Sequence, residues 1–298
     1  MNLLDDLTNK ELIPVVEIGS DKTYNPQYVI PCESYVIKIG NLVNSTGMKF
    51  NKNYEMIRKV GGLHNFFPKG GKAILSSIMT DKKIAGFNRE QFLSVIQATR
   101  PYSIITPDGE TYRNELKRSN YVMEQSLDSI DYLLDHDVRP DQMIGLVLGA
   151  NIRQIDEYIL ELKQRKIPKF CLHTGDFNFR RGAKSKQIAI DYARHIRSQV
   201  PYLMVYGGGC RTFFQRYDFA HAFVTQSHIV AGFKHKKICR HGQKRYDGEL
   251  SRDLIMSNLY EIYHYHFNRE DIMSLSNIFE TSCVEVSNEN ASSPIGGV

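Results

Sequence analysis

Residues 140–149, PDQMIGLVLG, form the stretch of sequence that decides the fold. Its apolar run, Met143 to Leu148, is bounded by turn-forming residues on both sides, which is typical of a buried parallel strand. Isoleucines and leucines then recur at helical spacing from Ile152 to Leu162, until Pro168 ends the pattern. The stretch therefore predicts one strand–helix unit.

The same alternation of apolar runs and helical patterns continues on both sides of this unit. Further strands are predicted at 102–105, 169–172, 202–206 and 220–224, and helices at 89–98, 115–134 and 183–198. Such repetition is typical of a (β/α)8 barrel or a doubly wound sheet. Because the first units lack a G-x-G-x-x-G fingerprint, we predict the α/β class and a (β/α)8 TIM barrel.

The chain is expected to hold one barrel domain over residues 1–285, ending in a helical segment that begins near Asp253. Residues 286–298 are polar and contain Gly, Ser and Pro, so we predict a disordered tail there. An apolar fraction of 42% and a charged fraction of 24% are those of an ordinary globular protein. The size permits a full core.

Charge and cysteine content narrow the function classes. The formal net charge of +5 permits a nucleic-acid partner without requiring one. The five cysteines are scattered without a C-x-x-C pair, which argues against a disulfide framework and a cysteine-based zinc site. The sequence shows neither a membrane span nor a signal peptide, so we expect a cytoplasmic protein with no membrane partner. It points to no metal and no cofactor.

Function in either architecture gathers at the carboxyl ends of the parallel strands. The residues that follow the predicted strands are polar or glycine, and they include Asp108, Glu110, Gly149, His173, Gly175, Asp176, Gly207, Gly208 and Gly209. Loops of this composition are common without any function. Their recurrence after five strands favours a ligand-binding rim.

A basic segment follows the last predicted strand. It carries Lys234, Lys236, Lys237, Arg240, Lys244 and Arg245, and a neighbouring loop adds Arg180 and Arg181. Such a density of cations fits contacts to nucleic-acid phosphates, and salt-dependent binding would follow. A solvated surface loop is the alternative interpretation.

Several segments resemble, in order and spacing, those of the tRNA-guanine transglycosylase (queuine tRNA-ribosyltransferase) superfamily. They are the run from Gly40 to Ser77, residues 118–127 of the long helix, Pro140 to Gln154, Tyr202 with the Gly207 triplet, and Ser257 to Tyr260. The similarity covers about residues 12 to 265. The family includes a branch that acts on DNA.

The resemblance implies a TIM barrel that exchanges a guanine in tRNA or DNA for a 7-deazaguanine base. In the family, one aspartate attacks the anomeric carbon of the sugar, a second handles protons, and a third binds the flipped-out base. The resemblance also implies a dimer, either of this chain or with a catalytic relative.

The chain departs from the family pattern at the catalytic positions. Ser77 stands where the family has its proton-transferring aspartate, and Val224 stands where it has the nucleophile. Leu148 replaces a base-recognising glutamine. The zinc motif is absent, because Cys239 is isolated and Ser257 replaces the last ligand.

Among the carboxylates, Asp108 is the counterpart of the base-binding aspartate, with Glu110 as the neighbouring candidate. Asp81, Asp176 and Asp218 are candidates for relocated catalytic groups. Two functional classes therefore remain open. The chain is either a divergent enzyme that acts on the N-glycosidic bond of a guanine or 7-deazaguanine nucleotide, or a pseudoenzyme that serves as a nucleic-acid-binding or partner subunit. Exchange by the family's own mechanism is predicted to be absent or very slow.

Overall fold

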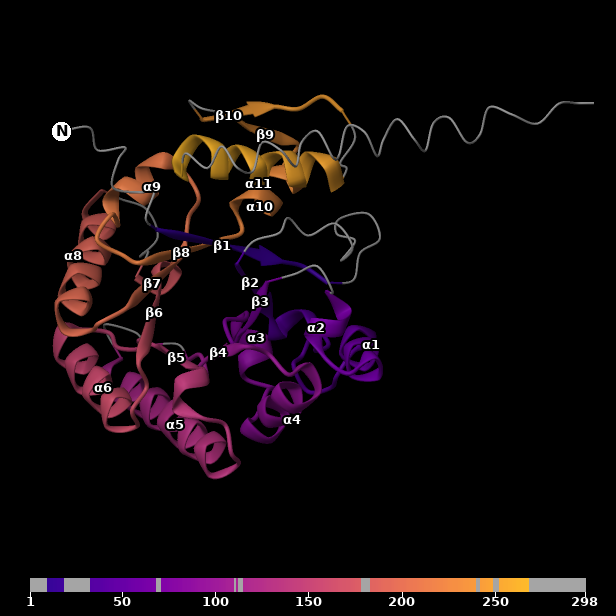
Figure 1. The fold of residues 1–298 in the computed structure, drawn as a ribbon. Coiled ribbons are helices and arrows are strands. Elements are labelled where there is room, and N and C mark those ends of the chain that lie inside the picture. The colour runs from indigo at the N-terminus through magenta and orange to yellow at the C-terminus, as the bar shows by residue number, and fades with distance from the viewer. Residues whose placement is uncertain are drawn as a thin grey trace, which may run out of the picture.

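Eight parallel strands close into a barrel, shown in Figure 1. The computed structural model describes residues 10–18, 33–67, 71–109, 111, 115–177, 183–239, 242–248 and 252–267. The barrel strands are β1 Glu11–Val16, β2 Ser34–Lys38, β3 Lys72–Ser76, β4 Ser103–Ile105, β5 Met143–Leu146, β6 Lys169–His173, β7 Leu203–Gly207 and β8 Ala222–Thr225. The predicted α/β class and TIM barrel are confirmed.

Closure of the barrel comes from the first strand, which pairs with β2 on one side and with β8 on the other. Ile13 lies opposite Val224, and Val224 lies opposite Tyr206 of β7. Every neighbouring pair is parallel, so all eight strands present their carboxyl ends at the same end of the barrel. A doubly wound sheet would have left open edges.

Helices surround the barrel in Figure 1. They are α1 Lys52–Val60, α2 Leu63–Phe66, α3 Asp81–Ile84, α4 Arg89–Thr99, α5 Leu116–Asp135, α6 Ile152–Gln164, α7 Thr174–Phe177, α8 Ala183–Gln199, α9 Arg211–Arg216, α10 Ser227–Phe233 and α11 Arg252–Phe267. Asparagine side chains cap the starts of α1, α4 and α6, at Asn51, Asn88 and Asn151.

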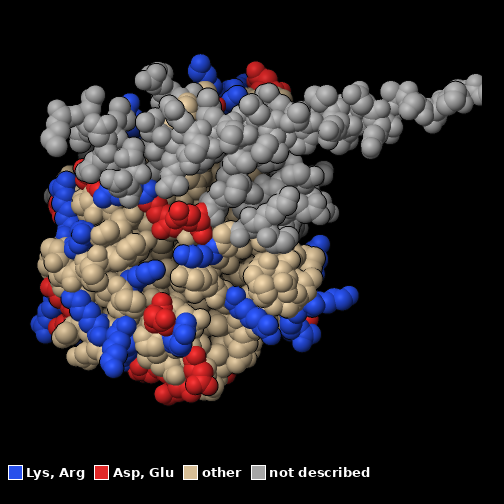
Figure 2. All heavy atoms as spheres, viewed as in Figure 1, with Lys and Arg blue, Asp and Glu red and all other residues tan. Residues whose placement is uncertain are grey.

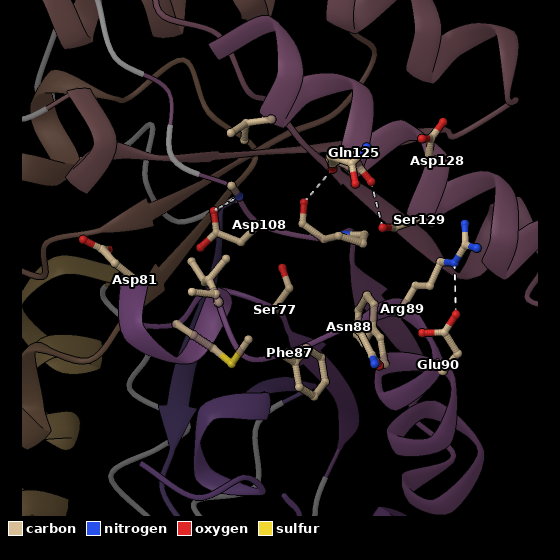
Figure 3. A pocket seen from close by; sticks show the side chains of 18 of the residues that line it. Ser77, Asp81, Phe87, Asn88, Arg89, Glu90, Asp108, Gln125, Asp128 and Ser129 are labelled. Atoms are coloured by element: carbon tan, nitrogen blue, oxygen red, sulfur yellow. Dashed lines mark hydrogen bonds and ion pairs between the residues drawn. The ribbon is translucent and has the colours of Figure 1, made fainter. Parts of the chain in front are cut away.

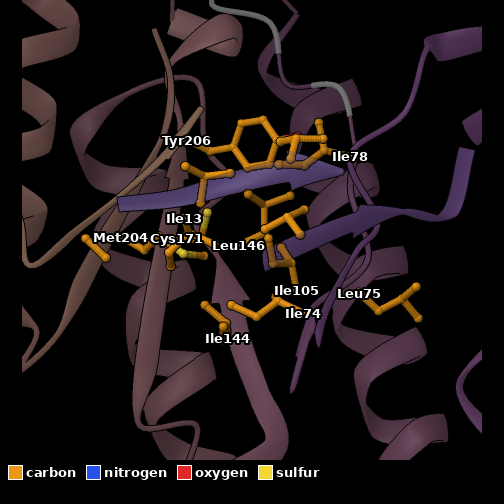
Figure 4. Close-up of a cluster of buried hydrophobic side chains, with 14 of the residues drawn as sticks. Ile13, Ile74, Leu75, Ile78, Ile105, Ile144, Leu146, Cys171, Met204 and Tyr206 are labelled. Carbon is orange, nitrogen blue, oxygen red and sulfur yellow. The ribbon is translucent and has the colours of Figure 1, made fainter. Parts of the chain in front are cut away.

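The barrel interior is filled with branched apolar side chains. Figure 4 shows Ile74, Ile105 and Ile144 lying together, with the Tyr206 ring beside Ile78 at another level. All five are buried. The interior is therefore a packed core, and a ligand site must lie beyond the strand ends.

The last described helix, α11, packs against α10 and contacts β1. The Tyr263 hydroxyl donates a hydrogen bond of 2.7 Å to the carbonyl oxygen of Leu12. Two short strands outside the barrel, β9 Lys236–Cys239 and β10 Gly242–Arg245, also adjoin this region. The predicted tail at 286–298 lies outside the described residues. Within them, none of the helices has both the length and the apolar character needed to cross a membrane.

Candidate functional site

A cavity of about 700 Å³ opens between the loops that follow β3 and β4. Its walls come from those two loops, from α3, from the start of α4 and from one face of α5. The polar residues in its lining are Ser77, Asp81, Asn88, Arg89, Glu90, Asp108, Arg118, Gln125, Ser126, Asp128 and Ser129. This is the end of the barrel at which TIM-barrel enzymes carry their active sites.

Hydroxyl groups tie the strand ends beneath the cavity to one another. Ser77 is 3% exposed, and its hydroxyl donates to the carbonyl oxygen of Thr106. The Thr106 hydroxyl in turn accepts a hydrogen bond of 2.8 Å from the amide of Leu146. The carboxyl ends of β3, β4 and β5 are therefore fixed relative to each other, and the floor of the cavity is rigid.

Asp108 follows β4 in a short loop that packs closely on α5. A Cβ atom added at Gly109 would lie 2.3 Å from Val122, so only glycine fits there. Ser126 of α5 donates 2.8 Å to the carbonyl oxygen of Pro107, and the buried Tyr158 hydroxyl donates 2.8 Å to Ser126. These contacts hold the half-buried carboxylate at the cavity wall.

The hydroxyl of Tyr158 stays protonated in this arrangement. Burial raises the pKa of Tyr158 above its ordinary value, while the hydrogen bond with Ser126 opposes the shift. A neutral donor is the form required to bridge α6 to α5. The phenol therefore supports the loop of Asp108 as a hydrogen-bond donor at neutral pH.

Two carboxylates from different loops line this one cavity. Asp81 begins α3, and Asp108 comes from the loop after β4. Figure 3 shows both on one side of the cavity, with Ser77 and Phe87 in the middle and Asp128 on the far side. One Asp108 oxygen accepts a hydrogen bond of 2.8 Å from the Gly109 amide.

Apolar side chains complete the cavity. Met79, Ile84, Phe87, Phe92 and Val122 all contribute to its lining. Flat heterocycles bind well between such side chains when polar groups at one edge fix their orientation. The composition therefore suits a planar ring that carries hydrogen-bond donors.

The remaining predicted base-binding residues do not join Asp108. The lining of this cavity does not include His173 and Gly207, which end β6 and β7, nor the residues that follow β5, β6 and β7 at the same end of the barrel, namely Gly149, Gly175, Gly208 and Gly209. Close neighbours explain why two of these positions are glycine. A methyl group would lie 2.1 Å from Thr174 at Gly207 and 2.3 Å from Thr225 at Gly209. Close packing between loops explains these positions without a ligand.

The candidate catalytic carboxylates lie in different parts of the structure. Asp81 lines the cavity. Asp218 precedes β8 and therefore lies at the amino ends of the strands, so the expectation that it reaches this site needs correction. Asp176 belongs to α7, but its side chain lies outside the described residues, as do Glu110, Arg180, Arg181 and Arg240.

The basic residues Lys234, Lys236, Lys237, Lys244 and Arg245 lie on or beside the hairpin of β9 and β10, apart from the cavity lining. Among the described residues, no three His, Cys, Asp or Glu side chains gather as metal ligands. The absence of a zinc site stays a prediction from Cys239 and Ser257.

Sequence reasoning missed one charged group at the barrel mouth. Lys38 ends β2, and its ammonium group donates to the side-chain oxygen of Gln226, which follows β8. Burial lowers the pKa of Lys38, and the charge of Glu17 opposes that shift. A lysine directly after the apolar run YVI was the available signal.

Comparison with known protein families finds no match for this chain, and comparison with curated proteins finds none either.

Proposed function

We propose that the protein is transglycosylase-like and acts on a guanine or 7-deazaguanine base of tRNA or DNA at its N-glycosidic bond. One observation carries this proposal: Asp81 and Asp108 line the same cavity at the carboxyl end of a TIM barrel. One carboxylate can attack the anomeric carbon while a second one in the same cavity accepts hydrogen bonds from the base.

Each carboxylate has a distinct place in the proposal. Asp108 is half-buried and held by its loop, which suits it to accept the ring N–H and amino donors of a guanine edge. Asp81 is exposed at the cavity edge, where a sugar would lie if the base occupied the apolar part. Its role is attack on the anomeric carbon, which forms a bond from carboxylate oxygen to carbon as the base departs with the bonding electron pair.

The second candidate is a binding subunit without catalysis. It is favoured by Val224, which is 0% exposed and faces Ile13 and Tyr206 across the strand pairs. The position that the resemblance gives to the nucleophile is therefore closed. On this alternative Asp108 still binds the base, and Asp81 has no chemical role.

The test is incubation of the protein with labelled guanine and with bulk tRNA or duplex DNA. Incorporation of label that requires Asp81 supports the enzyme. Asp108→Asn is expected to weaken guanine binding about ten- to a hundred-fold, because a charge-assisted hydrogen bond contributes roughly 1.5–3 kcal/mol.

Asp128→Asn is the matched control, since Asp128 lines the far side of the same cavity. It is expected to leave guanine binding within about two-fold of the wild type, a difference of about 0.4 kcal/mol. Asp108-dependent binding without incorporation supports the binding subunit. Guanine affinity that is indifferent to Asp108, or lost with Asp128, contradicts both candidates.

A further inference from the structure

The basic segment forms an independent element on the outside of the barrel. Among the described strands, β9 and β10 pair with each other alone, in an antiparallel hairpin that lies against α10 and α11 (Figure 1). The hairpin was not foreseen from the sequence. It gives the cations of this segment a fixed geometry that a loop would not provide.

The register of the hairpin places like charges directly opposite each other. Lys237 faces Lys244, and Lys236 faces Arg245. Like charges across an antiparallel pair destabilise it. Arg245 forms an ion pair of 3.1 Å with Asp247, but both side chains are highly exposed and the pair relieves little of this repulsion.

A buried asparagine holds the hairpin in place despite this repulsion. Asn258 of α11 is 0% exposed. Its side chain accepts a hydrogen bond of 2.7 Å from the Ile238 amide and donates one of 2.9 Å to the Lys236 carbonyl oxygen. Ile238 itself is buried against the helices. The cations of β9 therefore lie on a strand whose backbone is held in place by α11.

One face of this element is hollowed. A cavity of about 670 Å³ is lined by Lys234, Lys236, Arg245, His235 and Tyr246, together with Asp247 and Gly248. Three cations thus line one concave surface beside an aromatic ring. Cations bind phosphate groups, and a tyrosine ring offers a surface for a sugar or a base.

Charge elsewhere is distributed differently. On the face seen in Figure 2, basic and acidic side chains are interspersed over the barrel helices. The hairpin carries cations on both strands and has Asp247 as a described acidic neighbour.

We propose that this hairpin binds the phosphodiester backbone of a nucleic acid. The inference rests on the proposed function for its partner, but it concerns a separate surface. A polyanion relieves the repulsion between the cross-strand cations, and a two-stranded ribbon has the shape that fits a nucleic-acid groove. The hairpin contributes affinity for the nucleic-acid backbone that does not depend on which base is bound.

The experiment compares two double variants of equal charge change. Lys236→Gln with Arg245→Gln removes the opposed cations at the hollow. Lys163→Gln with Arg139→Gln removes one lysine and one arginine at exposed positions of α6 and of the turn before β5. Binding to duplex DNA, to single-stranded DNA and to bulk tRNA is measured from 50 to 200 mM salt, and guanine binding is measured separately.

The hairpin variant is expected to bind nucleic acid about ten- to thirty-fold more weakly at 150 mM salt. The slope of log K against log salt should fall by about 1.8 for duplex DNA or about 1.4 for a single strand. The control variant should keep the wild-type slope, and both variants should bind guanine as the wild type does.

Equal slopes for the two variants overturn the proposal. So does a wild-type protein that binds vesicles containing 30% phosphatidylserine but not nucleic acid at 50 mM salt. If the hairpin variant binds nucleic acid as the control variant does while guanine binding is intact, the proposed guanine site at Asp108 still stands. If guanine binding is absent but the hairpin variant still loses affinity for nucleic acid, only the guanine site is contradicted.

Discussion

Ser77 and Val224, the positions at which the resemblance places two aspartates of the family, have different surroundings in the barrel. Ser77 lines the cavity beside Asp108, but it is 3% exposed and its hydroxyl donates to the Thr106 carbonyl oxygen, which a carboxylate cannot do. Val224 is wholly buried between Ile13 and Tyr206 in the strand register, where a charge would be taken out of water at a cost of several kcal/mol. An aspartate would therefore be costly at both positions, because it would lose a hydrogen bond at residue 77 and would be wholly buried at residue 224. The proposed function gives the role of nucleophile to Asp81, which lines the cavity.

His228 lends itself to a pH prediction at the same scale. Its side chain is 0% exposed within α10, and burial lowers its pKa to about 3, with a backbone contact from Val15 opposing the shift. In the unfolded chain this histidine binds a proton near pH 6.5, whereas in the folded protein it stays neutral at that pH. The free energy of unfolding should therefore fall as the pH drops below 6.5, and His228 should have no such effect above pH 7.5.

The expected loss from this one histidine is about 1.4 kcal/mol between pH 7.5 and pH 5.5. Urea denaturation at both pH values measures it, and His228→Gln should reduce the pH dependence by that amount. His64→Gln, at an exposed position, is the control. A pH dependence that is the same in His228→Gln and in the wild type would contradict the prediction.

Elements with strong apolar signals were the ones that sequence could predict. The strand at Met143 and the helix from Ile152 follow directly from their spacing, and the structure ends that strand at Leu146 instead of Leu148. Strands β1, β2 and β3 were not predicted. Pro14 lies within β1, and proline normally argues against a strand interior.

The hairpin was missed for a related reason. Of its eight residues, Ile238 is the buried apolar one, so its strands carry almost no apolar alternation. What fixes it is a tertiary contact, the side chain of Asn258 from a later helix. The cavity was missed in the same way, because pairing Asp81 with Asp108 depends on how two loops fold.

Asn258 therefore has a stability cost that can be measured. Asn258→Ala leaves the Ile238 amide and the Lys236 carbonyl oxygen without their buried partner, and we expect a loss of about 2–4 kcal/mol in the free energy of unfolding. Asn65→Ala removes a side-chain bond to the Val60 carbonyl oxygen at an exposed site and should cost less than about 1 kcal/mol. Equal denaturation midpoints for the two variants would show that the anchor contributes nothing.

At the scale of the whole molecule, closure of the barrel brings the two ends of the described chain together. Strand β1 completes the barrel by pairing with β8, and α11 then covers this junction. The hydrogen bond from Tyr263 to the Leu12 carbonyl oxygen links residues 251 positions apart. A barrel has no free edge from which strands can leave singly, so the ends should not unfold independently.

This coupling predicts the behaviour of Tyr263→Phe. Loss of one buried donor should lower the free energy of unfolding by about 1–2 kcal/mol. Tyrosine fluorescence is a suitable tertiary probe, because the chain has 17 tyrosines and no tryptophan. Its urea midpoint should move together with that of far-UV circular dichroism. Tyr121→Phe, at a side chain that is 60% exposed on α5, should leave both midpoints in place. If Tyr263→Phe shifts the fluorescence midpoint alone, α11 detaches before the barrel opens, and closure does not bind the two ends into one cooperative unit.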